Sequence, residues 1–170
     1  MFKSKYVFIA GILLITSFIG LTTGNTASAA DTYYPAHCVN SSYAKQSGAT
    51  DTSYEPGRFC IISPDQQYRV VFQFDGNLVV YNANGTASWS SKTYNQNATR
   101  FSFQSDGNLV IYRNSTPIWS TGTNGSWLNT VGSTLRITMQ NDGNFVEYRS
   151  PQASTVNQTA LWSSKNGRTY

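Results

Sequence analysis

Five side chains recur in this chain with one fixed spacing, and together they offer the chemistry of hydrogen bonding to a neutral polyol. The pattern is Gln-x-Asp-x-Asn-x-Val-x-Tyr, and in every copy a Gly follows the Asp. A carboxylate accepts hydrogen bonds from hydroxyl groups, the two amides donate and accept, and the phenol does both. The valine adds an apolar surface that suits the C–H face of a ring. Because the pattern implies no cation, phosphate-binding loop or acid–base pair, it indicates binding of an uncharged ligand.

The pattern occurs three times, with starting residues that lie 31 and 36 positions apart. The candidate carbohydrate-binding residues are Gln73, Asp75, Asn77, Val79 and Tyr81; Gln104, Asp106, Asn108, Val110 and Tyr112; and Gln140, Asp142, Asn144, Val146 and Tyr148. Asp and Asn are also common in turns and Val and Tyr in strands, so a purely structural role in a hairpin is the alternative. A hairpin does not require Gln, Asp, Asn and Tyr together, and this polar content favours binding.

Short β-strands must position these side chains, because no segment after the first 30 residues sustains a helical apolar period. On one straight strand the five residues would span roughly 26 Å, which is too long for one monosaccharide. The Asp-Gly pair is a tight-turn signal, so we expect the chain to fold the Gln back towards the Val and Tyr. A Trp follows each copy, and the repetition predicts that Trp89, Trp119 and Trp162 meet in a shared structural core.

The first 30 residues have the layout of a secretory signal peptide. Lys3 and Lys5 precede a mostly apolar run over residues 7–19, and small residues at 27–30 offer a cleavage site. The run is shorter than the roughly 20 residues of a membrane-spanning helix, so we expect a secreted protein without membrane insertion after signal removal. Without the two lysines the formal charge falls from +4 to +2. There is no basic cluster, and a nucleic-acid partner is not expected.

Residues 31–53 differ from the rest of the chain. They are polar and lack strand alternation, so we expect an irregular N-terminal arm before a domain over residues 54–170. The only two cysteines are Cys38 and Cys60. In an exported protein a single disulfide between them is the default expectation, and two free buried thiols are the alternative. A disulfide would tie the arm to the first repeat.

The sequence offers no constellation typical of an enzyme. Its one histidine, His37, stands beside a cysteine in the arm, and there is no Ser/His/Asp set, metal-ligand cluster or phosphate loop. Three equivalent aspartates suit three binding sites better than one acid–base pair. We therefore expect a binding protein with no catalytic residues and no metal.

The repeated motif resembles the sugar site of the bulb-type, mannose-binding lectins first recognised in monocot plants. The segments Pro117-Ile118-Trp119-Ser120-Thr121 and Ser63-Pro64-Asp65-Gln66-Gln67-Tyr68-Arg69 are also similar to that family, and the resemblance covers residues 54–167. It implies an all-β fold, a β-prism II of three four-stranded sheets about a pseudo-threefold axis, with the repeated tryptophans inside. It also implies binding of α-D-mannose, mannose-type glycans or a cell-surface polysaccharide without metal or other cofactor.

The resemblance assigns a role to each motif position. The aspartates and asparagines would surround the 2-hydroxyl of mannose, the glutamines would reach the 3-hydroxyl, the tyrosines the 4-hydroxyl, and the valines the ring carbons. Two features depart from the family pattern: the plant proteins carry a cysteine pair around the first motif, and the third repeat here has a longer connection after its motif. Family dimers often exchange the C-terminal strand, so the resemblance implies a homodimer of that kind. The longer connection in the third repeat argues against it.

Lectin-like bacteriocins share the motif and supply an alternative function. They are antimicrobial proteins that dock on the surface polysaccharide of a target cell, usually through two such domains in tandem. This chain contains one such domain. The sequence therefore favours a secreted carbohydrate-binding protein and keeps the antimicrobial role as the alternative.

Overall fold

A computed structural model describes residues 38–46, 49–125, 133–150 and 157–169, and all regular elements in these ranges are β-strands. The strands are β1 (Val39–Asn40), β2 (Ser42–Gln46), β3 (Thr52–Tyr54), β4 (Phe59–Ile62), β5 (Arg69–Phe72), β6 (Leu78–Tyr81), β7 (Ala87–Ser90), β8 (Arg100–Phe103), β9 (Leu109–Arg113), β10 (Thr116–Ser120), β11 (Thr134–Met139), β12 (Phe145–Ser150), β13 (Thr159–Ser163) and β14 (Gly167–Arg168). Within these ranges no helix could cross a membrane. The expected signal peptide, residues 1–30, and His37 lie outside the described residues.

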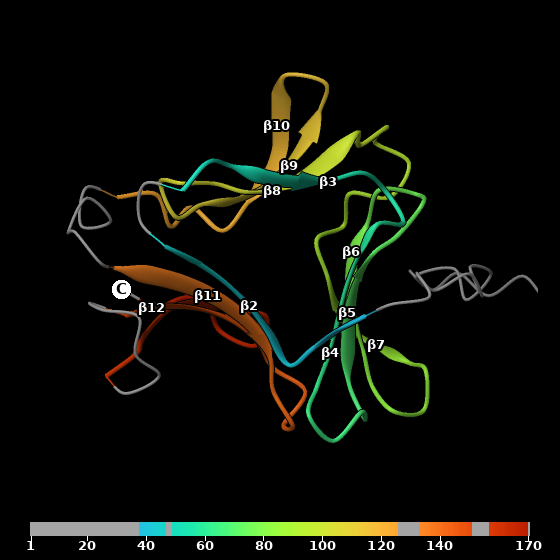
Figure 1. Ribbon diagram of the computed structural model, residues 1–170. Coiled ribbons are helices and arrows are strands. Elements are labelled where there is room, and N and C mark those ends of the chain that lie inside the picture. Colours follow the sequence, from blue (N-terminus) through green and yellow to red (C-terminus); the bar gives the residue numbers. More distant parts are fainter. Residues whose placement is uncertain (1–37, 47–48, 126–132, 151–156, 170) are drawn as a thin grey trace, which may run out of the picture.

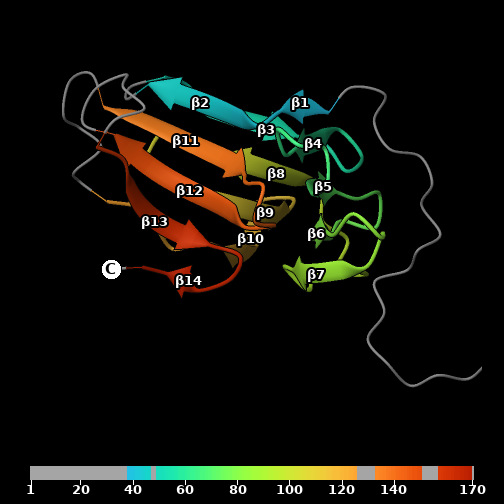
Figure 2. The ribbon, with the colours of Figure 1, turned by 90° about the horizontal axis from the view of Figure 1, so that it is seen from below.

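The strands form three sheets that enclose a common interior (Figure 1). The first sheet has the order β1-β4-β5-β6-β7, the second β10-β9-β8-β3, and the third β14-β13-β12-β11-β2. Each sheet thus has four strands, and the two-residue strands β1 and β14 extend two of them. Figure 2 shows the full width of the third sheet, with β2 at one edge and β14 at the other. The four-stranded sheets expected from the sequence are confirmed, with these two short additions.

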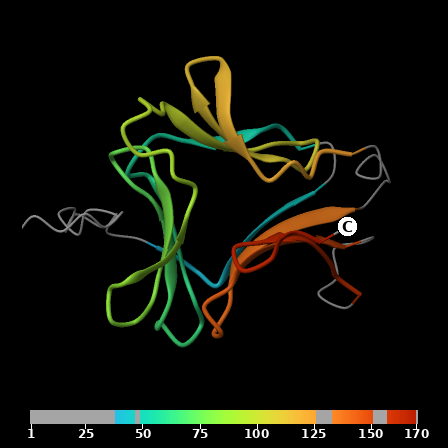
Figure 3. The ribbon, with the colours of Figure 1, turned by 180° about the vertical axis from the view of Figure 1, so that it is seen from behind.

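The segment from β2 to β4 supplies each sheet with its fourth strand. β2 pairs with β11 in the third sheet, β3 pairs with β8 in the second, and β4 pairs with β5 in the first. Figure 3 shows this segment from behind, running past all three sheets. The expectation of an irregular arm over residues 31–53 is therefore wrong for its described part. No strand signal is visible there because the edge strands β2 and β3 carry polar residues and owe their pairing to strands far along the chain.

Alternation along the strands buries one face of every sheet in a single apolar core. The inward residues include Val70 and Phe72 from the first sheet, Phe101 and Phe103 from the second, and Ile137 and Phe145 from the third. Most of these side chains are fully buried. Because successive residues point to opposite faces, the residues between them point outward, and these include the motif residues.

The three repeated tryptophans lie together on the inner side of the prism. The ring centroids of Trp89 and Trp119 are 5.7 Å apart, those of Trp89 and Trp162 5.2 Å, and those of Trp119 and Trp162 5.7 Å. All three pairs meet edge to face, a geometry that aromatic quadrupoles favour. The cluster joins the last long strand of each repeat, and it fixes the three sheets relative to one another.

The C-terminal strands pair within their own chain. β13 pairs with β12, and β14 pairs with β13. A homodimer formed by exchange of this strand stays a prediction.

Candidate functional site

A three-residue turn folds each motif into a hairpin. In the first copy the Gly76 amide donates to the Gln73 carbonyl, and the Gln73 amide donates to the Asn77 carbonyl. The same two bonds recur in the second and third copies. The turn glycines Gly76, Gly107 and Gly143 have φ angles of 80°, 88° and 78°. Such left-handed backbone favours glycine, which explains the Gly after each Asp.

The turn brings the Gln and Tyr of each motif into contact, as expected from the sequence. Gln73 Nε2 donates to Tyr81 Oη at 2.5 Å, and the equivalent bonds Gln104–Tyr112 and Gln140–Tyr148 are both 2.9 Å. The amide oxygen of the Gln and the hydroxyl hydrogen of the Tyr are then the groups that can serve a ligand. We call the three groups of motif residues the first, second and third sites, in chain order.

The Asp and Asn of each site are partly occupied in holding the turn. Asp106 Oδ1 accepts the Asn108 amide at 2.9 Å, and Asp75 and Asp142 do the same in their own turns. The Asn side-chain oxygen ties the hairpin to the segment after the Trp: in the second site Asn108 Oδ1 accepts from the Gly122 amide at 2.9 Å. Two groups are left to bind a ligand: the second carboxylate oxygen of the Asp, which accepts hydrogen bonds, and the Nδ2 group of the Asn, which donates them.

The valines form the floor of the sites, but they present little surface. Val79 is 0% exposed, and Val110 and Val146 are each 2% exposed. In the second sheet Val110 pairs across the strands with Ser102, and in the third Val146 pairs with Thr138. In each of these two sites the buried valine therefore has a neighbour with a hydroxyl group, Ser102 in the second site and Thr138 in the third. Contact of the valines with the ring carbons of a sugar stays a prediction.

The first site differs because a disulfide lies over its outer face. Cys38 is joined to Cys60, as expected from the exported character of the chain. Cys60 pairs across the strands with Val71, and Val71 pairs with Val79. Cys38 packs against the buried cluster that Cys60, Val71, Val79 and Tyr81 form. An apolar, covered row thus replaces the hydroxyl-bearing row of the other two sheets.

The polar residues of the first site are correspondingly buried. Gln73 is 7%, Asn77 1% and Tyr81 6% exposed, whereas their counterparts in the second and third sites are all partly exposed. Gln73 Oε1 is buried without a hydrogen-bond partner. Sequence repetition makes the three motifs equivalent, but the burial of its polar residues makes the first site closed.

The third site carries one feature of its own. Lys165 Nζ lies 3.3 Å from Asp142 Oδ2, and both side chains are about half exposed. An exposed pair of this kind contributes about 0–1 kcal/mol, so a ligand hydroxyl can compete with it for the carboxylate. Of the two open sites, only the third has its Asp carboxylate in an ion pair with a residue that the structure describes.

An arginine flanks every site, and the sequence analysis did not single it out. Arg69, Arg100 and Arg136 pair across the strands with Tyr81, Tyr112 and Tyr148. The Arg100 guanidinium lies 4.0 Å from the centroid of the Tyr112 ring, and that of Arg69 lies 5.2 Å from the Tyr81 ring. The signal was present in the sequence, because each motif Gln has an Arg four residues before it.

A buried acid stands behind the third motif. Glu147 is 0% exposed and occupies the position that Val80 and Ile111 hold in the other repeats. Its Oε2 accepts from Thr123 Oγ1 at 2.9 Å, and Thr123 also contacts the Gly107 carbonyl of the second site's turn. Burial raises the pKa of Glu147 to about 8, despite the lowering effect of this hydrogen bond. The carboxyl is therefore mostly protonated at neutral pH.

Metal binding has no obvious place in this arrangement. Across the described ranges, no three His, Cys, Asp or Glu side chains gather in a way that could hold a metal ion. Hydroxyl, amide and carboxylate groups of the sites suit direct hydrogen bonding to a ligand.

Solved lectin structures share this architecture. A lectin from Marasmius oreades matches with a TM-score of 0.57 and 25% identity, over 77% of this chain and 97% of that one. A monomeric monocot mannose-binding lectin from Gastrodia elata matches with a TM-score of 0.55 and 28% identity, over 75% and 98%. The mannose-specific agglutinin from snowdrop, Galanthus nivalis, solved with methyl-α-D-mannoside, matches with a TM-score of 0.51 and 25% identity, over 70% and 98%.

These matches confirm the resemblance to bulb-type monocot lectins and the β-prism II fold predicted from the motif. A scan against protein-family models and a search of curated proteins gave no match.

Proposed function

We propose that this protein is a secreted lectin that binds α-D-mannose, or glycans that contain it, through its second and third sites. One observation carries the proposal. The same Gln–Tyr hydrogen bond and the same Asp-capped turn recur in each repeat, and in two repeats the polar atoms remain open to solvent. The similar solved structures are mannose-binding lectins, which are binding proteins and not enzymes.

Each open site matches the hydrogen-bonding capacity of a hexose. In the second site Asp106 and Gln104 offer acceptors, and Asn108 Nδ2 and the Tyr112 hydroxyl offer donors. Sugar hydroxyls also donate and accept, so adjacent hydroxyls can be satisfied together. We assign the Asp and Asn to the 2-hydroxyl, the Gln to the 3-hydroxyl, the Tyr to the 4-hydroxyl and the Val to the ring carbons, in the third site as in the second.

Secretion is supported by two independent features. The first 30 residues have the layout of a signal peptide, and the Cys38–Cys60 disulfide suits an oxidising compartment. The cell surface or extracellular space would then supply the glycan.

Single sites of this kind should bind weakly. A shallow patch with four hydrogen-bonding groups is expected to give a Kd of about 1 mM, or about −4 kcal/mol. Two sites on different faces of one molecule can raise the avidity for a crowded glycan surface by about 10²–10⁴.

Conservative replacement of the aspartates tests the proposal. Asp106→Asn and Asp142→Asn each keep an oxygen that can cap the turn, but they remove the charged acceptor that faces the sugar. A hydrogen bond to a charged group contributes about 1.5–3 kcal/mol, so each variant should lose at least about tenfold in affinity at its own site. Calorimetric titration with methyl α-D-mannoside should therefore give two sites in the wild type, one in each variant and none in the double variant.

A matched control separates binding from folding. Asp65 caps a turn outside the motifs, where its Oδ1 accepts the Gln67 amide at 3.1 Å, so Asp65→Asn should leave mannose binding unchanged. The proposal is wrong if the wild type shows no saturable response, or if the double variant binds as the wild type does while remaining folded.

A further inference from the structure

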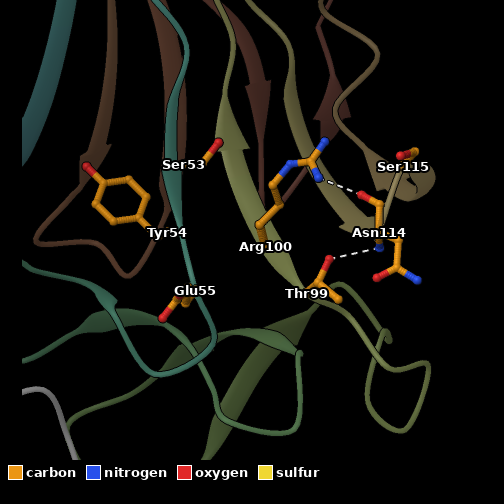
Figure 4. Close-up of a pocket in the computed structure, with 7 residues that line it drawn as sticks. All are labelled: Ser53, Tyr54, Glu55, Thr99, Arg100, Asn114 and Ser115. Carbon is orange, nitrogen blue, oxygen red and sulfur yellow. Dashed lines mark hydrogen bonds between the residues drawn. The ribbon is translucent and has the colours of Figure 1, made fainter.

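A groove of about 590 Å³ lies beside the second site (Figure 4). Each lining residue carries a polar group on its side chain, and the lining comes from three parts of the chain: the end of β3, the start of β8 and the turn between β9 and β10. The lining residues are Ser53, Tyr54, Glu55, Thr99, Arg100, Asn114 and Ser115. The volume falls within the range of about 300–1,000 Å³ that is usual for small-molecule sites.

Arg100 connects this groove to the second site. Its guanidinium lies on the ring of Tyr112, 4.0 Å from the centroid, and the hydroxyl of that ring belongs to the second site. Arg100 Nη1 also donates to the Asn114 carbonyl at 2.5 Å (Figure 4). One face of the guanidinium and one of its N–H groups are thus fixed by the protein, and an arginine has five such donors. The side chain is held in place for a ligand that extends past Tyr112.

The turn that faces Arg100 is itself held in place. The Asn114 amide donates to Thr99 Oγ1 at 2.8 Å, and Thr99 Oγ1 also contacts the Tyr112 carbonyl. Asn114 has a φ of 54°, which fixes the direction of the turn. The wall of the groove is therefore built where the residue before β8 meets the β9–β10 turn, and it does not depend on a single exposed side chain.

The second sheet alone places polar residues on the other side of this arginine. The last pair of β3 and β8 is Tyr54 with Phe101, so Glu55, the residue after β3, comes next to Arg100. In the third sheet the residue that pairs with Arg136 is Ala44, and in the first sheet the residue that pairs with Arg69 is Ile62. The arginine recurs in all three repeats, whereas the carboxylate beside it occurs only at the second site.

The charges in the groove favour a neutral ligand. Glu55 and Arg100 carry opposite charges, and the carboxylate would disfavour an acidic sugar. A guanidinium, a carboxylate and several hydroxyls together suit the vicinal hydroxyls of a second pyranose ring.

We propose that the groove is a second saccharide subsite, in which Arg100 and Glu55 bind the neutral hexose linked to the mannose of the second site. This inference rests on the proposed mannose binding and adds to it. The second site would prefer a disaccharide over a monosaccharide, and the third site, whose arginine faces Ala44, would not.

A site-resolved titration tests the subsite. The amides of Gly107 and Gly143 lie in the turns of the second and third sites, so their NMR signals report the two sites separately. We expect at least one of the α1,2-, α1,3- and α1,6-linked dimannosides to shift Gly107 with a Kd about tenfold lower than methyl α-D-mannoside, the size of one hydrogen bond to a charged group. At Gly143 the two ligands should differ by less than about twofold on the same scale.

Variants of two lining residues test whether the groove is the source of the disaccharide preference. Arg100→Ala and Glu55→Ala should each abolish the disaccharide preference at Gly107, and Glu55→Ala should leave the Kd for methyl α-D-mannoside there unchanged. Arg136→Ala is the matched control, because it removes the equivalent arginine of the third sheet and should leave the preference intact.

The remaining outcomes would overturn the subsite. A disaccharide preference that is absent, that is equal at Gly107 and Gly143, or that survives both groove variants contradicts it. If Arg100→Ala weakens the monosaccharide and the disaccharide equally, Arg100 only positions Tyr112. If neither glycine responds to methyl α-D-mannoside, the proposed function itself is wrong, and the subsite falls with it.

Discussion

At the scale of single residues, each motif side chain divides its polar atoms between the fold and a ligand. Asp106 caps the turn with one oxygen, and Asn108 uses its side-chain oxygen to hold the segment after Trp119. Gln104 donates to Tyr112 and so orients both side chains. A residue held in this way loses little conformational freedom when it binds. The structural and the binding interpretations of the motif are therefore both correct, for different atoms of the same residues.

Glu147 shows how one residue can break the repeat. The position faces the core, where Val80 and Ile111 stand in the other repeats. Its pKa is raised from 4.5 to about 8, because burial and, to a smaller extent, the nearby charge of Asp106 outweigh the lowering effect of hydrogen bonds from Thr123 and Thr121. Between these two pH values the folded chain holds a proton that the unfolded chain has released. The free energy of unfolding must therefore fall as the pH rises through this window.

Glu147→Gln should remove this dependence. The amide keeps the size of the side chain and a hydrogen-bond acceptor for Thr123, but it does not titrate. Relative to the variant, the wild type should lose stability by roughly 1.4 kcal/mol per pH unit within the window. Urea unfolding at several pH values between 5 and 8 measures the difference, and stability profiles that stay parallel would show that Glu147 does not bind a proton on folding.

At the scale of elements, local signals predicted the hairpins well and long-range pairing poorly. The Asp-Gly turn and the alternation around it depend on neighbouring residues, so the sequence revealed the sites and the contact of Gln with Tyr. The strand β2 depends instead on β11, which lies about 90 residues away in the chain. Nothing within residues 42–46 reveals that partner, and the segment was expected to be irregular.

The closed first site has the same origin. Its five residues match the motif as well as the others do, but Cys38 packs against the buried cluster that contains Val79. The count of cysteines and the export signal predicted the disulfide. It did not reveal that the disulfide would lie on a binding face, because that requires the path of the N-terminal segment relative to β4 and β5.

Removal of the disulfide should open the first site at a cost in stability. The cysteines are 22 residues apart, and a loop of this length corresponds to about 3 kcal/mol in the chain-entropy model. In a Cys38→Ser/Cys60→Ser double variant we expect a lower Tm and a new response of the Gly76 amide to methyl α-D-mannoside. If Gly76 stays silent in the folded variant, the disulfide is not what closes the site.

At the scale of the whole molecule, contacts between the repeats hold the three sheets in a fixed relation. The three tryptophans meet inside the prism. At the periphery the turn of the third motif touches the first repeat: the ring of Tyr68 lies against Gly143, and the Asp65 amide donates to Asn141 Oδ1 at 3.1 Å. The fold therefore presents its sites as rigid patches on separate faces.

The position of the open sites on different sheets determines which glycans the molecule can bind with both sites at once. The outer faces of the three sheets point in different directions (Figure 1), so the second and third sites cannot share one small glycan. They can bridge neighbouring glycans, and bridging raises avidity without any new contact. A molecule with two open sites on different sheets is suited to glycan-covered surfaces rather than to free sugar.

Mannose binding at two of the three sites can be measured by a site-resolved titration of the turn glycines Gly76, Gly107 and Gly143 with methyl α-D-mannoside. We expect saturable shifts of Gly107 and Gly143 with a Kd of about 1 mM, and no saturable shift of Gly76 while the disulfide is intact. Saturable shifts at all three glycines would contradict the closure of the first site. The absence of a saturable shift at every one of them would contradict mannose binding itself.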